Sequence, residues 1–363
     1  MSNAVALRDL VAVAPNLHLR WSGVTATILS LVPLQAREIA IAATGVGLPG
    51  GIPRFPLIQL LTQGWSRPPG RPFRIWHARR NDEMLVGILL RDLLRQPWKL
   101  VFTSDAQRRH TGWTRFLLDR MDGLICTSPG GCACLDRPAA LVPHGVDTAR
   151  FRPAEDRAAE WAASGLPGRR GIGVFGRIRA SKGTDLFVEA MIRLLPRYPD
   201  VTAVVTGLAT PKERDFLEAL QRKVRQAGLE ERIRFLGECP PEEMPLWFRR
   251  VSVLVAPQRI EGFGLTPLEA MASGTAVVAT RTGAAPVLIL DGKTGRLVPP
   301  NDLEALVAAI DPLLADPDLA ERMGRAGREH VCAHHDIARE VAGLAAVYEA
   351  LWAGEQVSRV RSS

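Results

Sequence analysis

Short apolar runs alternate with amphipathic stretches along almost all of the 363 residues, and this alternation constrains the fold more than any other feature. The pattern predicts parallel sheets whose strands are joined by helical crossovers. We expect a first series of strands at residues 10–15, 38–44, 73–78, 99–104, 122–127 and 140–143. A second series is expected at residues 171–178, 201–207, 233–236, 251–256, 276–280 and 295–298. Two series indicate two doubly wound α/β domains.

A polar segment at residues 148–170, rich in glycine and proline, separates the two series and is typical of a linker. We therefore predict an N-terminal domain of residues 1–165 and a C-terminal domain of residues 166–336. Residues 337–351 carry apolar side chains at helical spacing, and no strand follows them. This last helix, at about 337–355, is expected to pack back on the first domain.

The charge is unevenly distributed along the chain. Residues 1–150 hold 18 Lys and Arg against 10 Asp and Glu, whereas residues 151–363 hold 28 of each. A basic first half favours a polyanionic partner, either an anionic membrane surface or a phosphorylated lipid. Its arginines are scattered without interleaved aromatic residues, so we expect no nucleic-acid partner. An arginine-rich composition that serves solubility is the alternative explanation.

Several features predict a cytoplasmic protein. No run approaches the 18 apolar residues of a spanning helix, and the first ten residues lack the apolar core of a signal peptide. The five cysteines show no zinc-like spacing, and we expect free, mostly buried thiols. A metal at Cys132 and Cys134 is the less favoured alternative to a small-residue turn.

The segment from Glu261 to Gly274 follows a predicted strand and contains a glycine-rich turn before a predicted helix. Gly262 and Gly264 allow a tight turn, and Thr266 is suited to cap the helix. Backbone N–H groups and the helix dipole at such a start attract phosphate. Glu261 and Glu269 lie on either side of this turn, where they can flank a ligand. An ordinary strand–turn–helix explains Glu269 but neither the two glycines nor Glu261.

Two cations form a second candidate phosphate site. Arg177 leaves the end of a predicted strand, and Lys182 stands just before a predicted helix. An arginine fork and a mobile lysine charge together suit a diphosphate. A helix cap with two solvated cations explains the same residues. In the first domain, Gly23 follows Trp21 and Ser22 in a small-residue loop that allows close approach of a ligand, although a helix cap at Ser22 fits equally well.

Taken together, these motifs resemble glycosyltransferase family 4. The resemblance rests on Arg177 with Lys182, on the Glu261–Glu269 pair, and on residues 142–147 (VPHGVD). Residues 22–28, 73–91 and 102–120 are similar to bacterial lipopolysaccharide core mannosyltransferases that use GDP-mannose. The resemblance implies a GT-B fold, in which two Rossmann-like domains face each other across a cleft. It also implies a retaining transferase of the inner membrane face that moves mannose to the lipopolysaccharide inner core.

The same resemblance implies roles for individual residues. Arg177 and Lys182 would bind the donor diphosphate, Glu261 the sugar hydroxyls and Glu269 the ribose. The backbone amides of Gly264, Leu265 and Thr266, together with Gly23, would complete the donor site. Asp105 stands where some relatives have histidine, and either donor orientation or proton transfer is its expected role, with a capping carboxylate beyond a strand as the alternative. Asp105 and Glu261 are the candidate catalytic residues. His77 and Arg80 are candidates for the acceptor side, with strand packing and helix capping as alternatives.

We expect no cofactor and no metal. The single Asp-x-Asp match, Asp316 to Asp318, lies between helical stretches, where Asp318 is suited to cap a helix. Preorganised cations can stabilise the departing diphosphate without a metal. Other functions left open are transfer from a UDP-linked hexose, nucleotide-sugar epimerisation, and non-catalytic sugar or membrane binding. An oxidoreductase is disfavoured, because the Gly-x-Gly-x-x-Gly matches at Gly45 and Gly171 lack the required helix start.

Overall fold

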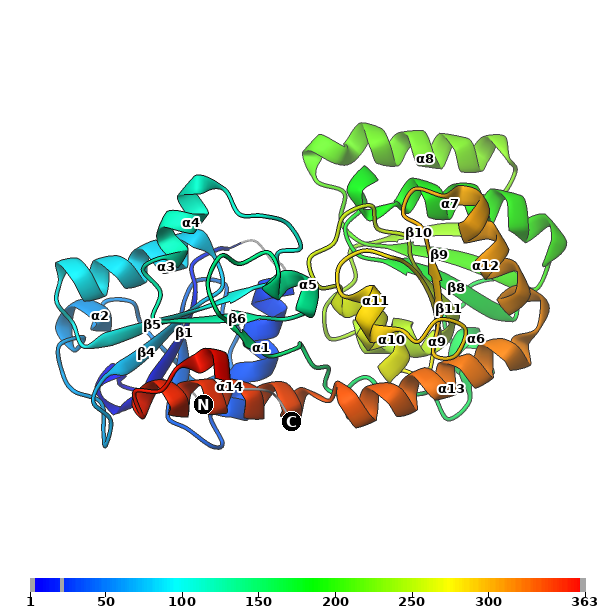
Figure 1. Cartoon of the computed structure of the whole chain (residues 1–363). Coiled ribbons are helices and arrows are strands. Elements are labelled where there is room, and N and C mark those ends of the chain that lie inside the picture. Colours follow the sequence, from blue (N-terminus) through cyan, green and yellow to red (C-terminus); the bar gives the residue numbers. More distant parts are fainter. Residues whose placement is uncertain (1–3, 20–22, 360–363) are drawn as a thin grey trace. The chain divides into compact units, whose positions relative to one another are not determined.

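A computed structural model describes residues 4–19 and 23–359 of the chain (Figure 1). The chain forms two compact units, each built around its own parallel sheet. Unit 1 comprises Met1–Gly145 and Ile337–Ser363, and unit 2 comprises Val146–Asp336. The two expected series of strands are therefore confirmed as two sheets in two separate compact units.

Unit 1 contains a seven-stranded parallel sheet in the order β3-β2-β1-β4-β5-β6-β7. Its strands are β1 (Ala12–Asn16), β2 (Ile41–Gly45), β3 (Arg54–Phe55), β4 (Arg74–Ala78), β5 (Trp98–Ser104), β6 (Gly123–Cys126) and β7 (Ala140–Leu141). The order reverses between β1 and β4. At such a switch point, the carboxyl ends of the strands form the usual ligand-binding edge of an α/β sheet.

Helices cover the sheet of unit 1. They are α1 (Gly23–Gln35), α2 (Gln59–Thr62), α3 (Asn81–Ile88), α4 (Gly112–Leu118), α5 (Pro129–Cys132) and α14 (Ile337–Trp352), with a π-helical turn, η2 (Leu89–Leu93), directly after α3 and short 3-10 turns at η1 (Leu7–Asp9) and η6 (Val357–Arg359). Strands β1 and β4 are buried throughout, as expected of parallel strands covered by helices on both faces of the sheet. Helix α3 and the turn η2 follow each other without a break, so residues 81–93 form one continuous helical segment.

The C-terminal helix α14 packs on unit 1, as the sequence predicted. Its buried side chains Leu344 and Tyr348 join the same apolar cluster as Ile75 of β4 and Val101 of β5. The indole Nε1 of Trp352 donates a hydrogen bond to the carbonyl of Phe73 at 3.1 Å. The last segment of the chain thus completes the core of the first unit.

Unit 2 contains a six-stranded parallel sheet in the order β10-β9-β8-β11-β12-β13. Its strands are β8 (Arg170–Phe175), β9 (Val201–Thr206), β10 (Ile233–Gly237), β11 (Val251–Ala256), β12 (Ala276–Thr280) and β13 (Arg296–Val298). Its helices are α6 (Arg157–Ala162), α7 (Thr184–Leu194), α8 (Arg214–Gln226), α9 (Met244–Arg250), α10 (Leu265–Ala272), α11 (Ala285–Leu288), α12 (Leu303–Ala315) and α13 (Pro317–His334), with 3-10 turns at η3 (Ala180–Lys182), η4 (Leu195–Arg197) and η5 (Pro211–Glu213).

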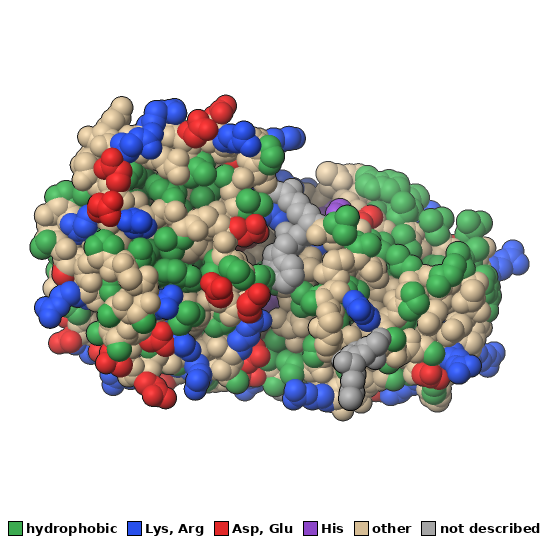
Figure 2. All heavy atoms as spheres, turned by 180° about the vertical axis from the view of Figure 1, so that it is seen from behind, with side chains coloured by type: hydrophobic (Ala, Val, Ile, Leu, Met, Phe, Trp, Pro, Cys, Tyr) green, Lys and Arg blue, Asp and Glu red, His purple; other side chains and the backbone are tan. Residues whose placement is uncertain are grey.

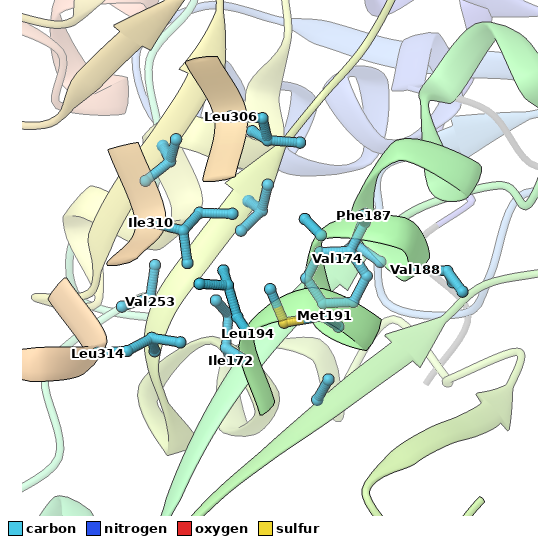
Figure 3. Close-up of a cluster of buried hydrophobic side chains, with 14 of the residues drawn as sticks. Ile172, Val174, Phe187, Val188, Met191, Leu194, Val253, Leu306, Ile310 and Leu314 are labelled. Carbon is cyan, nitrogen blue, oxygen red and sulfur yellow. The ribbon is translucent and has the colours of Figure 1, made fainter. Parts of the chain in front are cut away.

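The core of unit 2 is aliphatic and lies between the sheet and its covering helices. Figure 3 shows Phe187 and Met191 of α7 close to Val174 of β8, and Ile310 of α12 beside Leu194 of α7. These side chains are almost completely buried. The strand order reverses between β8 and β11, so the loops that follow these two strands lie at the switch point of this sheet.

The predicted domain boundary at residue 165 is wrong. Residues 146–165 belong to unit 2, and the expected linker contains helix α6. Asp156 caps this helix, because its side chain accepts a hydrogen bond from the N–H of Ala159 at 3.0 Å. Trp161 is 1% exposed and lies so close to Gly171 that a Cβ there would be 2.1 Å from the indole ring. One buried tryptophan thus ties this glycine- and proline-rich segment to the second core.

The expectation of five free, mostly buried thiols is also wrong. Cys126 at the end of β6 and Cys132 at the end of α5 form a disulfide, with Cα atoms 5.1 Å apart. Cys134 and Cys239 are partly exposed, and Cys332 is exposed. The disulfide joins residues only six positions apart, because helix α5 folds back directly on the strand that precedes it.

Candidate functional site

The glycine-rich segment of unit 2 forms the expected turn and helix start. Gly264 adopts a left-handed conformation with φ 95° and is the N-cap of α10, which begins at Leu265. Thr266 therefore lies in the first turn and is not the cap, contrary to expectation. No described side chain caps this helix start. The first N–H groups of a helix have no intrahelical partner, so this start is suited to bind an anion.

The loops that follow β8 and β11 are held together by direct contacts. Arg259 forms a bidentate ion pair with Asp185 at 2.7 and 2.8 Å, and its N–H donates to the carbonyl of Ser181 at 3.0 Å. Gly183 has φ 70°, and a Cβ there would lie 1.9 Å from the carbonyl oxygen of Pro257. Only glycine fits this close approach. Two predicted motifs 79 residues apart are thereby placed side by side.

Lys182 and Glu261 form an ion pair between these two loops. The Lys182 side chain is 24% exposed and that of Glu261 is 18% exposed, so solvent reaches both groups. The second carboxylate oxygen of Glu261 accepts a hydrogen bond from the N–H of Gly262 at 3.0 Å. Arg177 lies in the same loop as Lys182, two residues after the end of β8. A cation and an anion thus stand together beside an uncapped helix start.

Glu269 lies one turn inside α10 and is partly buried. Burial raises the pKa of its carboxyl to about 7, while the positive charge of Arg150 acts in the opposite direction. At neutral pH the group therefore exists in both protonation states. A carboxyl group in this state can accept or donate a hydrogen bond, which suits a ligand hydroxyl.

In unit 1, three ionisable side chains form a cluster that we call the histidine cluster: His144 and Glu340, which are buried, and Asp105, which is partly exposed. The Nδ1 atom of His144 lies 2.7 Å from Glu340 Oε1, and its Nε2 atom lies 3.0 Å from Asp105 Oδ1. Glu340 also accepts a hydrogen bond from the N–H of Gly145 at 2.8 Å through its other oxygen. The imidazole is thus held between two carboxylates, one after β5 and one on α14.

The carboxylates keep His144 protonated. Burial alone would lower the pKa of His144, but Glu340 and Asp105 raise it to about 10. Partial burial alone would raise the pKa of Asp105, but the charge and hydrogen bond of His144 and a hydrogen bond from Thr127 lower it. Asp105 is therefore an oriented, ionised carboxylate with a 37% exposed side chain at the carboxyl edge of the sheet. This arrangement suits electrostatic orientation of a ligand better than proton uptake at neutral pH.

His77 does not border an acceptor site, and its predicted role is wrong. The side chain is completely buried in β4. Its Nδ1 atom lies 2.6 Å from the Tyr348 hydroxyl and its Nε2 atom lies 2.7 Å from the Thr103 hydroxyl. Burial lowers the pKa of this histidine well below its usual value. His77 is a neutral structural link between the sheet and α14.

Arg80 lies at the carboxyl edge of unit 1, but its guanidinium makes several contacts there. It donates to Asn16 Oδ1 at 2.9 Å, to Thr25 Oγ1 at 3.0 Å and to Glu83 at 2.8 Å. These bonds connect the ends of β1 and β4 with α1 and α3. Arg80 thus organises the edge of the sheet, and a role towards the acceptor stays a prediction.

Gly23 is the first residue of α1, and Trp21 and Ser22 lie outside the described residues. Gly23 is exposed, and among the described residues no atom other than those of its chain neighbours lies within 4 Å of the position that a Cβ would occupy. The space required for close approach of a ligand is therefore present at this helix start.

The Asp-x-Asp match is a helix cap, but through its first carboxylate. Asp316 accepts a hydrogen bond from the N–H of Leu319 at 3.0 Å, and α13 begins at Pro317. Asp318 lies in the first turn, so its expected capping role is wrong. Among residues 4–19 and 23–359, no group of three or more His, Cys, Asp and Glu side chains is arranged to hold a metal ion.

Sequence reasoning missed His144 and Glu340 as site residues. His144 was part of the motif VPHGVD that carried the family resemblance, yet it received no role of its own. Glu340 lies 196 residues further along the chain, on a helix read only for its apolar face. Glu340 lies three residues after Ile337 and four before Leu344, on the buried apolar face of α14. A carboxylate at this spacing within an apolar face was the available signal.

Comparison with solved structures defines the fold. The Anabaena protein Alr3699/HepE, solved in complex with UDP and glucose, matches with a TM-score of 0.79 and 17% identity, over 94% of this chain and all of that chain. The chain therefore has a GT-B glycosyltransferase fold, as expected.

Sequence comparison defines the family. The profile of the family described as Glycosyl transferases group 1 matches residues 159–330. The lipopolysaccharide core biosynthesis mannosyltransferase LpcC of Rhizobium leguminosarum bv. viciae is 51% identical over 346 residues, which cover 95% of this chain and 97% of that protein. The corresponding LpsB of Rhizobium meliloti strain 1021 is 47% identical over 351 residues, covering 96% and 99%. The chain belongs to the group 1 glycosyltransferase family.

The protein is accordingly an enzyme that transfers a sugar from a nucleotide-sugar donor to a glycoconjugate acceptor. Family membership decides against the epimerase, the oxidoreductase and the non-catalytic binder. Within the described part of the chain, no helix combines the length and apolar character required to span a bilayer.

Proposed function

We propose that this enzyme transfers mannose from GDP-mannose to the lipopolysaccharide inner core with retention of anomeric configuration. The observation that carries the proposal is the 51% and 47% identity, over nearly the whole chain, to two lipopolysaccharide core mannosyltransferases. Identity at this level extends over both units, including the unit that lies outside the family profile.

The proposed donor site uses the loops at the switch point of unit 2. Arg177 and Lys182 bind the diphosphate, together with the backbone amides of Gly264, Leu265 and Thr266. Breaking the sugar–phosphate bond places negative charge on the departing diphosphate, which cations and oriented N–H groups stabilise. Binding of the diphosphate draws Lys182 away from Glu261, and the freed carboxylate then accepts hydrogen bonds from sugar hydroxyls.

The remaining roles concern the base and the reacting sugar. Glu269 binds the ribose hydroxyls, where a carboxyl with a pKa of about 7 serves as either donor or acceptor of a hydrogen bond. Asp105, ionised beside His144, orients the donor sugar. The leaving phosphate takes the proton of the acceptor hydroxyl, so transfer and retention require no separate general base.

We also propose that transfer needs no metal, because Arg177, Lys182 and the helix start supply positive charge to the leaving group. The rate measured after dialysis against EDTA should equal the untreated rate. Added magnesium should not increase it. A rate that EDTA abolishes and that magnesium restores would assign the diphosphate contacts to a metal ion instead.

The direct test is a panel of GDP- and UDP-linked sugars offered with lipopolysaccharide inner-core acceptors that lack the mannose. We expect release of GDP from GDP-mannose only when acceptor is present, and an NMR spectrum of the product with the anomeric configuration of the donor. Transfer from a UDP-hexose with GDP-mannose inactive would overturn the proposed donor. Inversion of the anomeric centre would overturn the proposed stereochemistry.

The acceptor is an amphiphile, so we further propose that the enzyme works as a peripheral protein on the inner face of the cytoplasmic membrane. The excess of basic residues in the first part of the chain supports this location, since the inner leaflet is anionic.

A further inference from the structure

Exposed apolar side chains concentrate on unit 1. Among the described residues, fourteen large hydrophobic side chains are exposed, and ten of them belong to unit 1. Figure 2 shows hydrophobic side chains gathered over unit 1, which lies on the right in that view. Exposed apolar groups that lie close together indicate a surface that contacts something other than water.

Most of these side chains come from three neighbouring segments around α2, α3–η2 and α4. We call this region the apolar surface, and its principal members are Leu61, Trp65, Leu89, Leu93, Trp113 and Phe116. Their exposed fractions run from 44% for Leu89 to 70% for Leu93.

Hydrogen bonds show that the three segments adjoin one another. The indole Nε1 of Trp65 donates to the carbonyl of Leu94, directly after η2, at 2.8 Å. On the other side of η2, Arg91 donates to the carbonyl of Arg120, just beyond α4, at 2.9 Å. The three segments therefore adjoin, and their exposed apolar side chains lie on neighbouring parts of the surface of unit 1.

The helical spacing shows that this apolar face is distinct from the core. Leu85, Leu89 and Leu93 recur every four residues and are all exposed, whereas Met84 and Leu90 on the other side of α3–η2 are buried. Residues four apart lie on the same face of a helix. The helix thus has two apolar faces, and only one of them is used by the core of unit 1.

Basic side chains border the apolar surface. Arg95, Arg115 and Arg120 are exposed, and the guanidinium of Arg120 lies 3.8 Å from the centre of the Phe116 ring. Of the nearby carboxylates, Asp92 is paired with Arg91, and Asp119 is exposed. Unit 1 as a whole holds 20 Lys and Arg against 12 Asp and Glu, whereas unit 2 holds 26 of each.

We propose that the apolar surface is a docking surface for an anionic lipid bilayer. Leucine and aromatic side chains insert at the level of the headgroups, and the bordering arginines contact lipid phosphates. Charge complementarity favours this occupant over a second copy of the chain, because two basic surfaces repel each other. The proposal rests on the proposed function only in that the acceptor is a membrane lipid.

The test is sedimentation of the full-length protein with vesicles of phosphatidylcholine and phosphatidylglycerol. Leu89→Ser/Leu93→Ser/Trp113→Ser should lower the partition coefficient at least tenfold, because each side chain loses apolar contact with lipid. Arg115→Gln/Arg120→Gln should lower it by about fivefold for each arginine, and should weaken its salt dependence. Pure phosphatidylcholine should bind the wild type much less.

Matched controls lie on unit 2. Val287→Ser/Leu290→Ser removes side chains of similar exposure, and Arg322→Gln/Arg325→Gln removes exposed arginines from α13; both should partition like the wild type. Every variant should retain its circular dichroism spectrum and its rate with a delipidated, soluble core oligosaccharide.

Three results would overturn the docking surface: a wild type that stays in the supernatant, unit 1 variants that partition like the wild type, or a wild-type dimer that the same substitutions dissociate without any effect on vesicles. Absence of mannosyl transfer to every acceptor would instead refute the proposed function, since vesicle binding is measured without donor or acceptor.

Discussion

The two units share one architecture and differ in where they place charge. Both are parallel sheets with a reversal of strand order at which ligands usually bind. Unit 2 is electrically balanced and exposes four large hydrophobic side chains among its described residues, whereas unit 1 carries eight excess positive charges and exposes ten. Architecture therefore fixes where a site lies in each unit, and side chains decide what it contacts.

The family resemblance is also divided between the units. The group 1 profile lies entirely within unit 2, which contains Arg177, Lys182, Glu261 and Glu269. The two Rhizobium mannosyltransferases match over both units. We infer that unit 2 carries what the family shares and that unit 1 carries what distinguishes this group of transferases within it.

The paired ionisable groups of the two units differ in their exposure to solvent. In unit 1, His144 is about 5% exposed and is held between two carboxylates, so its charges are fixed before any ligand arrives. In unit 2, Lys182 and Glu261 are paired but partly exposed, so an anion can separate them. The charges around His144 therefore keep their arrangement with or without a ligand, whereas the Lys182–Glu261 pair can separate when a ligand binds.

The largest expected effect concerns the histidine cluster of unit 1. His144→Asn removes the cation between Asp105 and Glu340, and should lower the free energy of unfolding by about 3–5 kcal/mol. Because the pKa of His144 rises to about 10 on folding, its contribution is fully present below pH 6.5 and is lost as the pH approaches 10. Urea unfolding between pH 6 and pH 10 measures both effects.

The control for this prediction is His18→Asn, which removes an exposed pair with Asp82 and should cost less than about 1 kcal/mol. If His144→Asn does not fold, Glu340→Gln provides the milder test of the same cluster. If the free energy of unfolding depended on pH equally in the wild type and in the variants, the histidine cluster would not contribute the expected stability.

The second effect concerns the exchangeable pair of unit 2. Lys182→Ala should lower the rate of transfer more than about tenfold, roughly 1.4 kcal/mol or more in the barrier, with little change in folding. Lys212→Ala, at an exposed lysine in η5, is the matched control. Initial rates of GDP release at saturating donor provide the measurement. Unchanged turnover in a folded Lys182 variant would contradict the proposal that Lys182 binds the donor diphosphate.

A smaller effect is expected at Glu269. The pKa of its carboxyl is about 7 in the folded protein, above the ordinary value of 4.5, so stability is present below pH 4.5 and is lost as the pH rises through 7. Glu269→Gln should therefore gain about 1 kcal/mol over the wild type at pH 8, with no gain at pH 4.5. Urea unfolding at both pH values is the test, with exposed Glu231→Gln as control. A gain that does not depend on pH would contradict this ionisation.

The smallest effect is expected at the apolar surface. Leu89→Ser and Leu93→Ser should each change the free energy of unfolding by no more than about 0.5 kcal/mol, since both side chains are exposed. Leu194→Ala, in the core of unit 2, should cost about 2–5 kcal/mol by comparison. Thermal and urea unfolding of the three variants measures the difference. A large loss at Leu89 would mean that this face supports the fold and not a partner.

The sequence predicted the strands well, because each strand leaves a local apolar run. All twelve expected strands appear, and only the two-residue edge strand β3 was missed, since Arg54 and Phe55 are too few to form a pattern. The domain boundary failed because the packing of Trp161 on Gly171 is not visible in a glycine- and proline-rich segment. The local composition indicated a linker, but the packing of Trp161 on Gly171 makes this segment part of unit 2.

In the candidate site, the turn and helix start formed by neighbouring residues were predicted correctly, whereas features that depend on distant residues were not. The turn at Gly264 and its helix start were found because strand, turn and helix follow one another in the chain. His77 was misassigned because only the position of Tyr348, 271 residues away, shows that its ring is enclosed. The exposed leucines of α3–η2 have the spacing of an ordinary core face, and helical spacing does not tell which apolar side of a helix is covered.

The amino-acid order by itself determined the two-sheet architecture, the family, and the residues that stand beside the glycine-rich helix start of unit 2, because periodicity and turn chemistry act over a few neighbouring residues. Only the tertiary structure decided that Lys182 meets Glu261, that His144 lies between Asp105 and Glu340, and that three short segments share one apolar surface. Those contacts join distant parts of the chain, and their geometry exists only once each sheet is assembled and its helices are packed.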